Sequence, residues 1–268
     1  MPFTFQIGPL MLAADRALAV ALIMVFLILA GVIAKKKDRA AERAGWWALG
    51  AGVVAARAGF VAGNWDAFAA ELVSILAIWQ GGFSLAAGAA GAVAAIVLTM
   101  GLSRSAVALA GAVALLGGAY LGVSPLLRPD PQPLPAHVPI ERWSGETIAL
   151  SQFRGQPFVV NLWASWCLPC RREMPMLVDA ASRSPVPILL VNSGEERVSA
   201  EQFLRANRLP SRSVYLDPTA ALGAATGAGG YPATLFVNSA GQIETVHLGE
   251  ISRAMLATEL RKLEREVR

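Results

Sequence analysis

The feature that most constrains this chain is a set of long apolar runs in its first half. One of them, ALAVALIMVFLILAGVIA, covers residues 17–34, and its 18 residues carry no charge. At 1.5 Å per residue, a helix of this length is just long enough to cross the hydrocarbon core of a bilayer. Further runs follow at about residues 45–64, 82–102 and 106–127. The sequence therefore predicts an α-helical membrane domain with four spans within residues 1–128.

Basic residues predict how these spans are oriented. Five cations lie between the first two runs, namely Lys35, Lys36, Lys37, Arg39 and Arg43. Arg104 lies between the last two runs. Loops with such an excess of Lys and Arg stay in the cytoplasm, so both ends of the membrane domain are expected outside it. Because most cations follow the first run, that run is expected to be a retained helix rather than a cleaved signal peptide.

The second half has the composition of a soluble domain. From residue 136 onward the chain has 14 Lys and Arg against 13 Asp and Glu. Because this balance is nearly neutral, the net charge of +4 comes mainly from the membrane half, and nucleic-acid binding is not expected. Between the halves, RPDPQPLPAHVP begins at Arg128, and we expect an extended spacer over residues 129–139. The soluble domain is then expected over residues 140–268.

Strand and helix patterns alternate in this second domain. A short apolar strand at 158–163 runs into a helix, and a second buried strand is expected at 188–191. The remaining elements are a helix at 199–207, a strand pair at 233–237 and 242–248, and an amphipathic helix at 251–267. This order predicts an α/β domain of thioredoxin type.

The only two cysteines of the chain, Cys167 and Cys170, lie in the stretch SWCLPCRREMP. A zinc site would need two more Cys or His ligands at suitable spacing, and both histidines lie far from the pair in sequence. A redox-active dithiol needs only these two sulfurs, so neither a metal nor another cofactor is expected. At a helix N-terminus, unpaired N–H groups and the helix dipole lower the pKa of a thiol such as Cys167. Cys170 lies one turn later and can resolve a mixed disulfide.

With this order of elements, NLWASWCLPCRREMP and the later YPAT resemble motifs of the thioredoxin superfamily. Within it, they resemble the TlpA/ResA-like membrane-tethered thiol-disulfide oxidoreductases, over residues 136–268. The resemblance implies a redox-active disulfide between Cys167 and Cys170, with Glu173 as an acid that shuttles thiol protons. It also implies a substrate-binding surface with a cis proline that faces the cysteines, made of Trp166, Tyr231 and Pro232. The branch commonly has Asn six positions before the first cysteine, and this chain has Asn161 there.

Two of these residues keep an alternative interpretation from the sequence alone. Glu173 is equally well explained as a carboxylate near a helix N-terminus, where the helix dipole favours it. Trp166 is explained nearly as well by plain packing.

A second resemblance lies in the membrane domain. ARAGFVAGN at 56–64 and IWQGGFSLAAGAAG at 78–91 resemble prolipoprotein diacylglyceryl transferases. The matching positions are Arg57, Gly59, Trp79, Gly81, Gly82, Ser84, Gly88 and Gly91. The family's histidine is Ala86 here, which implies a truncated scaffold of shared ancestry that has lost lipid transfer. Arg57 is a charge inside a span and thus a functional candidate, unless it pairs with Asp66 or Glu71 or reaches the headgroups.

Together these features indicate a membrane-anchored thiol-disulfide oxidoreductase that reduces disulfides of exported proteins, with cytochrome c maturation as a client pathway. We expect it in a bacterial inner membrane, with the thioredoxin-like domain in the periplasm. Pro169 before the second cysteine resembles the reducing members of the superfamily. The alternatives are a thiol oxidase or isomerase of the same fold, and a lipid-handling protein whose thioredoxin module only docks partners. Since residues 1–128 contain no cysteine, a separate cysteine-bearing membrane reductase is expected as the electron donor.

Overall fold

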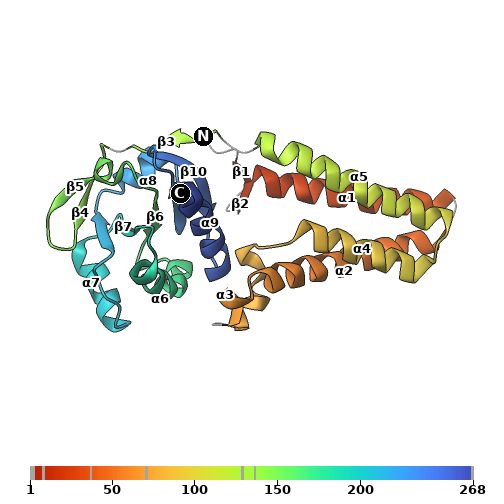
Figure 1. Cartoon of the computed structure of the whole chain (residues 1–268), viewed down its shortest axis with the longest axis horizontal. Coiled ribbons are helices and arrows are strands. Elements are labelled where there is room, and N and C mark those ends of the chain that lie inside the picture. Colours follow the sequence, from red (N-terminus) through yellow and green to blue (C-terminus); the bar gives the residue numbers. More distant parts are fainter. Residues whose placement is uncertain are drawn as a thin grey trace. The chain divides into compact units, whose positions relative to one another are not determined.

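The computed structural model describes residues 4–7, 10–36, 38–69, 72–127, 130–135 and 137–266. The chain divides into two compact units, Met1–Pro129 and Asp130–Arg268, each with a core of its own (Figure 1). Lys37, Glu71 and Arg128 lie outside the described residues, and so do positions 1, 129, 136, 267 and 268, which bound expected segments.

The N-terminal unit consists of helices that follow a short hairpin. The hairpin pairs β1 (Thr4–Ile7) with β2 (Leu10–Ala13) in antiparallel register, and the apolar runs did not predict it. The helices are α1 (Ala14–Lys36), α2 (Ala40–Gly63), α3 (Trp65–Ala69), α4 (Leu85–Met100) and α5 (Arg104–Val123). Single 3₁₀ turns occupy Leu72–Leu76, Ile78–Gln80 and Ser124–Leu127.

Among the described residues, three helical stretches are long and apolar enough to cross a membrane, namely Arg16–Lys36, Ala40–Gly63 and Arg104–Leu127. α4 is apolar but has 16 residues, so it is shorter than the span expected at 82–102. The later start of α4 has a local cause. Gly81 and Gly82 take positive φ values of 76° and 85°, which a right-handed helix does not contain, so α4 cannot extend back to residue 82. Ser84 then caps α4, its hydroxyl accepting a hydrogen bond from the N–H of Ala87. The fourth span stays a prediction.

Small residues set the distance between α2 and α4. A Cβ atom added at Gly91 would lie 2.9 Å from the carbonyl oxygen of Ala51. One added at Gly88 would lie 3.2 Å from the carbonyl oxygen of Gly52. Because backbone atoms occupy these positions, larger side chains would push the two helices apart. α2 and α4 are therefore closely packed within this unit.

The guanidinium group of Arg57 binds backbone carbonyls within the N-terminal unit. It donates to the carbonyl oxygens of Ser74 and Ile75 at 2.7 and 2.9 Å, and to those of Gly81 and Gly82 at 2.6 and 3.1 Å. Its guanidinium carbon also lies 5.2 Å from the centroid of the Phe68 ring. Arg57 thus ties the irregular segment before α4 to α2. Among the described residues it forms no ion pair with Asp66, which was one of the alternatives, and Glu71 lies outside those residues.

The C-terminal unit is built on an eight-stranded sheet with the strand order β3-β10-β9-β6-β7-β8-β4-β5. The strands are β3 (Gln132–Pro133), β4 (Pro139–Arg142), β5 (Thr147–Ala149), β6 (Phe158–Trp163), β7 (Ile188–Ser193), β8 (Val214–Asp217), β9 (Ala233–Val237) and β10 (Gln242–Leu248). The helices are α6 (Leu168–Arg183), α7 (Arg197–Ala206), α8 (Ala221–Thr226) and α9 (Arg253–Glu266), with a 3₁₀ turn at Leu150–Phe153. β6, β7 and β8 are parallel, whereas β9 is antiparallel to β6.

The central strands of this sheet are buried on both faces. Every residue of β6 and β7 is buried, which explains why these strands appear in the sequence as nearly continuous apolar runs. One face is covered by side chains of α6 and α9, among them Met174 and Leu256. The other face packs against Leu150 and Leu222. The sheet is thus a rigid support for the loops at its edge.

Part of the expected spacer belongs to this sheet. β3 pairs with β10, and the N–H of Leu134 donates to the carbonyl oxygen of Gly241 at 3.0 Å. The side chain of Leu134 is 4% exposed and lies in the core. Proline is compatible with an edge strand, where its missing N–H breaks no ladder bond. Residues 132–135 of the expected spacer therefore pack with the sheet, and the folded unit begins before residue 140.

Candidate redox site

The two cysteines lie where β6 leads into α6. Cys167 is the N-cap residue of α6 and Cys170 lies in its first turn. They form a disulfide, and the N–H of Cys170 donates a hydrogen bond to Cys167 Sγ at 3.2 Å. Cys167 is 5% exposed, whereas Cys170 is completely buried. A sulfur atom of another molecule can therefore reach Cys167 before it can reach Cys170.

Exposed apolar side chains flank Cys167 on both sides. Trp166 is 65% exposed and Leu168 is 64% exposed. The ring of Trp166 meets that of Tyr231 edge-on, with 5.9 Å between ring centroids. The Tyr231 hydroxyl donates to Ser193 Oγ at 3.0 Å, which fixes the second ring against β7. The structure thus brings Trp166 and Tyr231 together beside the outer cysteine.

Tyr231 and Pro232 lie at the end of the sheet that carries the cysteines. The peptide bond between them is cis. β9 is antiparallel to β6 and places Ala233 opposite Leu162, near the C-terminal end of β6. The residues just before Ala233 therefore lie beside the chain as it leaves β6 toward Cys167. This register explains how residues more than sixty positions apart in sequence meet at one site.

Glu173 lies one turn beyond Cys170 on α6, and its carboxyl group is buried. The residue is 3% exposed. Its Oε1 accepts a hydrogen bond from Asn161 Nδ2 at 3.0 Å, and its Oε2 accepts one from the N–H of Ile251 at 2.8 Å. Burial raises the pKa of Glu173 to about 7, although both hydrogen bonds act to lower it. The carboxyl group thus lies in a buried, hydrogen-bonded environment in the first half of α6.

Asn161 connects this carboxyl group to β9. Its Nδ2 also donates to Thr234 Oγ1 at 3.0 Å, and both residues are completely buried. Its Oδ1 is buried and has no hydrogen-bond partner among the residues that the structure describes. The network therefore contains one spare acceptor next to a carboxyl group that can hold a proton near neutral pH.

The sequence analysis missed Glu195, which binds the loop in front of Cys167. Its Oε2 accepts the N–H of Ser165 at 2.7 Å, and its Oε1 accepts the Ser165 hydroxyl at 2.6 Å. Asn192 Nδ2 also donates to Oε2 at 2.7 Å. The sequence did contain a signal for this residue. Glu195 follows the C-terminal end of β7, and Cys167 follows that of β6. Because loops at the C-terminal ends of parallel neighbouring strands lie at the same edge of a sheet, the two loops could be expected to meet.

Comparisons with known proteins agree with this geometry. The Redoxin family matches residues 132–263. The thiol:disulfide interchange protein DsbE of Pseudomonas fluorescens biotype C is 31% identical over 150 residues, which are 56% of this chain and 84% of that protein. The thiol-disulfide oxidoreductase ResA of Halalkalibacterium halodurans is 30% identical over 120 residues, 44% of this chain and 68% of that protein.

Among solved structures, StoA from Bacillus subtilis matches with 26% identity and a TM-score of 0.40, covering 47% of this chain and 98% of that one. The relatives and the Redoxin match confirm the thioredoxin-like α/β domain expected from the order of elements. The chain therefore belongs to the family of thiol-disulfide oxidoreductases that includes DsbE and ResA, and it is an enzyme of that class.

Proposed function

We propose that this enzyme reduces disulfides of exported proteins with Cys167 and Cys170, from a position anchored in a bacterial inner membrane. The observation that carries the proposal is the pair of cysteines at the N-terminus of α6, of which only Cys167 reaches the surface, with 5% exposure, whereas Cys170 is completely buried. Apolar side chains beside Cys167 offer a docking surface, and we assign substrate binding to Trp166, Tyr231 and Pro232. Proteins on the route to c-type cytochromes are the proposed clients.

Each turnover moves two electrons from the enzyme to the substrate. The thiolate of Cys167 attacks one sulfur of the substrate disulfide, so an intermolecular disulfide forms and the second substrate sulfur leaves as a thiolate. Cys170 then attacks Cys167 Sγ, which closes the disulfide seen in the structure and releases the first substrate sulfur. The substrate gains two protons and two electrons, and the enzyme is left oxidised.

Glu173 is the proposed proton carrier for the inner sulfur. Cys170 is buried and has to lose its proton before it can attack. Glu173 lies on the same helical face one turn later, and with a pKa of about 7 it can accept a proton at neutral pH and return it afterwards. Water need not enter the core for this step.

Glu195 is a proposed positioning residue, because it acts through Ser165 and not on the reacting atoms. Three donors converge on its carboxylate, and two of them belong to the residue two positions before Cys167. Such charge-assisted bonds hold a loop in one geometry. Glu195 thereby keeps Trp166 and Cys167 presented together to a partner.

The electrons have to come from another protein. Residues 1–129 contain no cysteine, so the N-terminal unit cannot relay electrons by thiol exchange. We therefore propose a separate cysteine-bearing membrane reductase as the donor. Four spans, with α4 as the third, would place the redox unit in the periplasm.

The N-terminal unit is proposed to share ancestry with prolipoprotein diacylglyceryl transferases. Contacts within the unit support this, because they join the two stretches that carry the resemblance. Arg57 donates to the carbonyls of Gly81 and Gly82. A Cβ atom added at Gly59 would meet the side chain of Ser84. Five of the matching positions therefore pack together where α2 meets the segment before α4, namely Arg57, Gly59, Gly81, Gly82 and Ser84.

Cysteine replacement tests the proposed function. Cys167→Ser should abolish reduction of a model protein disulfide by the full chain in the presence of dithiothreitol. Cys170→Ser should leave an attacking thiol that stays bound to its substrate as a mixed disulfide, which non-reducing gels and mass spectrometry detect. Unchanged turnover in Cys167→Ser would contradict the assignment of Cys167 as the nucleophile.

A further inference from the structure

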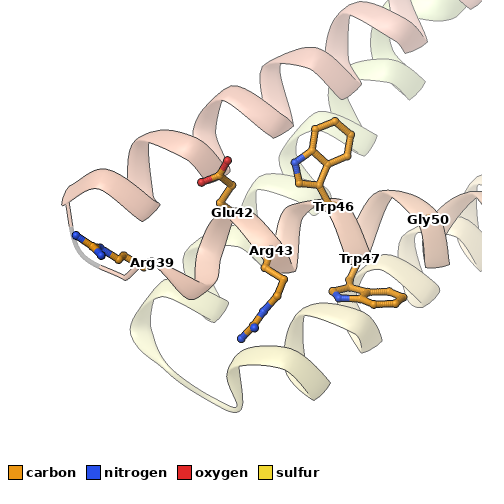
Figure 2. Close-up of a pocket in the computed structure, with 6 residues that line it drawn as sticks. All are labelled: Arg39, Glu42, Arg43, Trp46, Trp47 and Gly50. Carbon is orange, nitrogen blue, oxygen red and sulfur yellow. The ribbon is translucent and has the colours of Figure 1, made fainter.

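The first turns of α2 form an open groove of about 600 Å³ along the exposed stripe of the helix, lined by Arg39, Glu42, Arg43, Trp46, Trp47 and Gly50. Figure 2 shows Arg43 and Trp47 projecting to one side of α2, and Glu42 and Trp46 to the other. Gly50 adds no side chain, so the groove is open at that end. Spacings of three and four residues place these six positions on one broad face of α2, from which the side chains project to either side of the groove.

The opposite stripe of α2 is the one that packs inside the unit. Ala41, Ala44, Gly45 and Ala48 are buried there. Trp46 and Trp47 are instead 60% and 61% exposed. Exposure of two large indole rings to water is unfavourable, whereas tryptophan is typical of the headgroup layer of a bilayer. The groove therefore faces lipid if the unit is embedded in a membrane.

The charge around the groove is positive. Lys35 and Lys36 are exposed in the last turn of α1, and Arg39 and Arg43 are exposed at the start of α2. Within the described part of the chain, the structure shows no ion pair for any of these four cations. Asp38 and Glu42 supply two nearby acids, and Asp38 accepts the N–H of Ala40. An anion that approaches the groove thus meets an excess of positive charge.

We propose that this groove binds one anionic phospholipid, with the phosphate at Arg39 and Arg43 and an acyl chain along Trp46, Trp47 and Gly50. The length of the groove supports a lipid over a soluble anion. Arg39 to Gly50 spans eleven helical residues, or roughly 16 Å. The headgroup layer of one leaflet is only about 5–8 Å thick, so the groove continues into the hydrocarbon. The proposal rests on the membrane embedding described above, and it concerns a site separate from the redox unit.

Lipid titration of the full chain tests the proposal. The chain is purified in detergent, stripped of lipid and titrated with cardiolipin or with phosphatidylcholine, and native mass spectrometry counts the bound molecules. Cardiolipin should bind at much lower concentration than phosphatidylcholine. Replacing both Arg39 and Arg43 by Gln should weaken cardiolipin binding roughly tenfold or more. Arg16→Gln removes the same charge at the other end of α1 and should leave binding unchanged. Equal binding of the two lipids, or an equal loss in Arg16→Gln, overturns the proposal.

A second variant tests which lipid group lies in the groove. Glu42→Gln removes a like charge and should strengthen cardiolipin binding. Weaker binding in Glu42→Gln would show that the acid holds an amine, and so that a zwitterionic lipid is the occupant. Displacement of cardiolipin by inorganic phosphate would make the site one for free anions.

Alkaline extraction of membranes tests the embedding separately. Release of the chain would reject the embedding alone, whereas loss of the arginine effect would reject the lipid site alone. If the double variant does not fold by circular dichroism, Arg43→Gln by itself should show a smaller loss in the same direction, and no loss would count against the site.

Discussion

Glu173→Gln should change how the stability of the redox unit depends on pH. Burial raises the pKa of Glu173 from 4.5 to about 7 in the folded state. Between these values the folded state binds a proton that the unfolded state has lost, so the free energy of unfolding falls as pH rises through this range. At 1.36 kcal/mol per pKa unit, the loss amounts to about 3 kcal/mol, and no reduction for solvent screening is needed at 3% exposure. The glutamine variant cannot ionise and should not show this loss.

The assay is urea unfolding of the oxidised unit Asp130–Arg268, followed by circular dichroism from about pH 4 to about pH 9. All other titrating groups are common to the parent and the variant. The difference between their free energies of unfolding therefore reports on Glu173. Near pH 4 the variant should be equal to or less stable than the parent, because the glutamine amide cannot accept both donors. Between about pH 4 and about pH 8, the free energy of unfolding of the variant should rise by about 3 kcal/mol relative to that of the parent.

Glu196→Gln is the control for loss of a carboxylate, because Glu196 is exposed, and its difference from the parent should stay small at every pH. A Glu173→Gln difference that does not change with pH would show that the carboxylate is solvated in the folded state. A difference of the opposite sign would show that the hydrogen bonds from Asn161 and Ile251 outweigh burial.

Three further predictions concern the loop, the membrane topology and the electron supply. Glu195→Gln should lower the free energy of unfolding by about 1 kcal/mol and speed hydrogen exchange at the Ser165 amide, whereas Glu196→Gln should do neither, and equal effects would contradict the positioning role. Reporters active only outside the cytoplasm should work when fused after Leu127 and fail when fused at Lys36, and the reverse pattern would place the dithiol in the cytoplasm. In cells without the membrane reductase, thiol trapping should find the two cysteines as a disulfide, and a reduced pair would point to another route for electrons.

The sequence could predict those parts of the fold whose signal is local. β6 and β7 are fully buried and thus nearly continuous apolar runs. Two cysteines three positions apart, without further metal ligands and directly after an apolar strand, indicated a dithiol at a helix N-terminus. β4, β5 and β8 have only three or four residues with partly polar sequences, so no period is visible in them.

Long-range contacts explain what the sequence could not predict about the site. The buried carboxyl group of Glu173 accepts a hydrogen bond from the N–H of Ile251, which is 78 positions away in sequence. The role of Glu195 depends on a serine that is 30 positions away. Neither contact can be predicted from the pattern of apolar residues.

Arg57 has a consequence for how this chain can vary. Its partners are main-chain carbonyls at Ser74, Ile75, Gly81 and Gly82, which every amino acid possesses. No substitution can remove these acceptors or exchange their charge with Arg57, so these four hydrogen bonds have no side-chain partner with which Arg57 could covary. Among relatives that keep this segment, we expect the arginine to be fixed even where the side chain at Ile75 changes. A search for correlated substitutions would therefore overlook this contact.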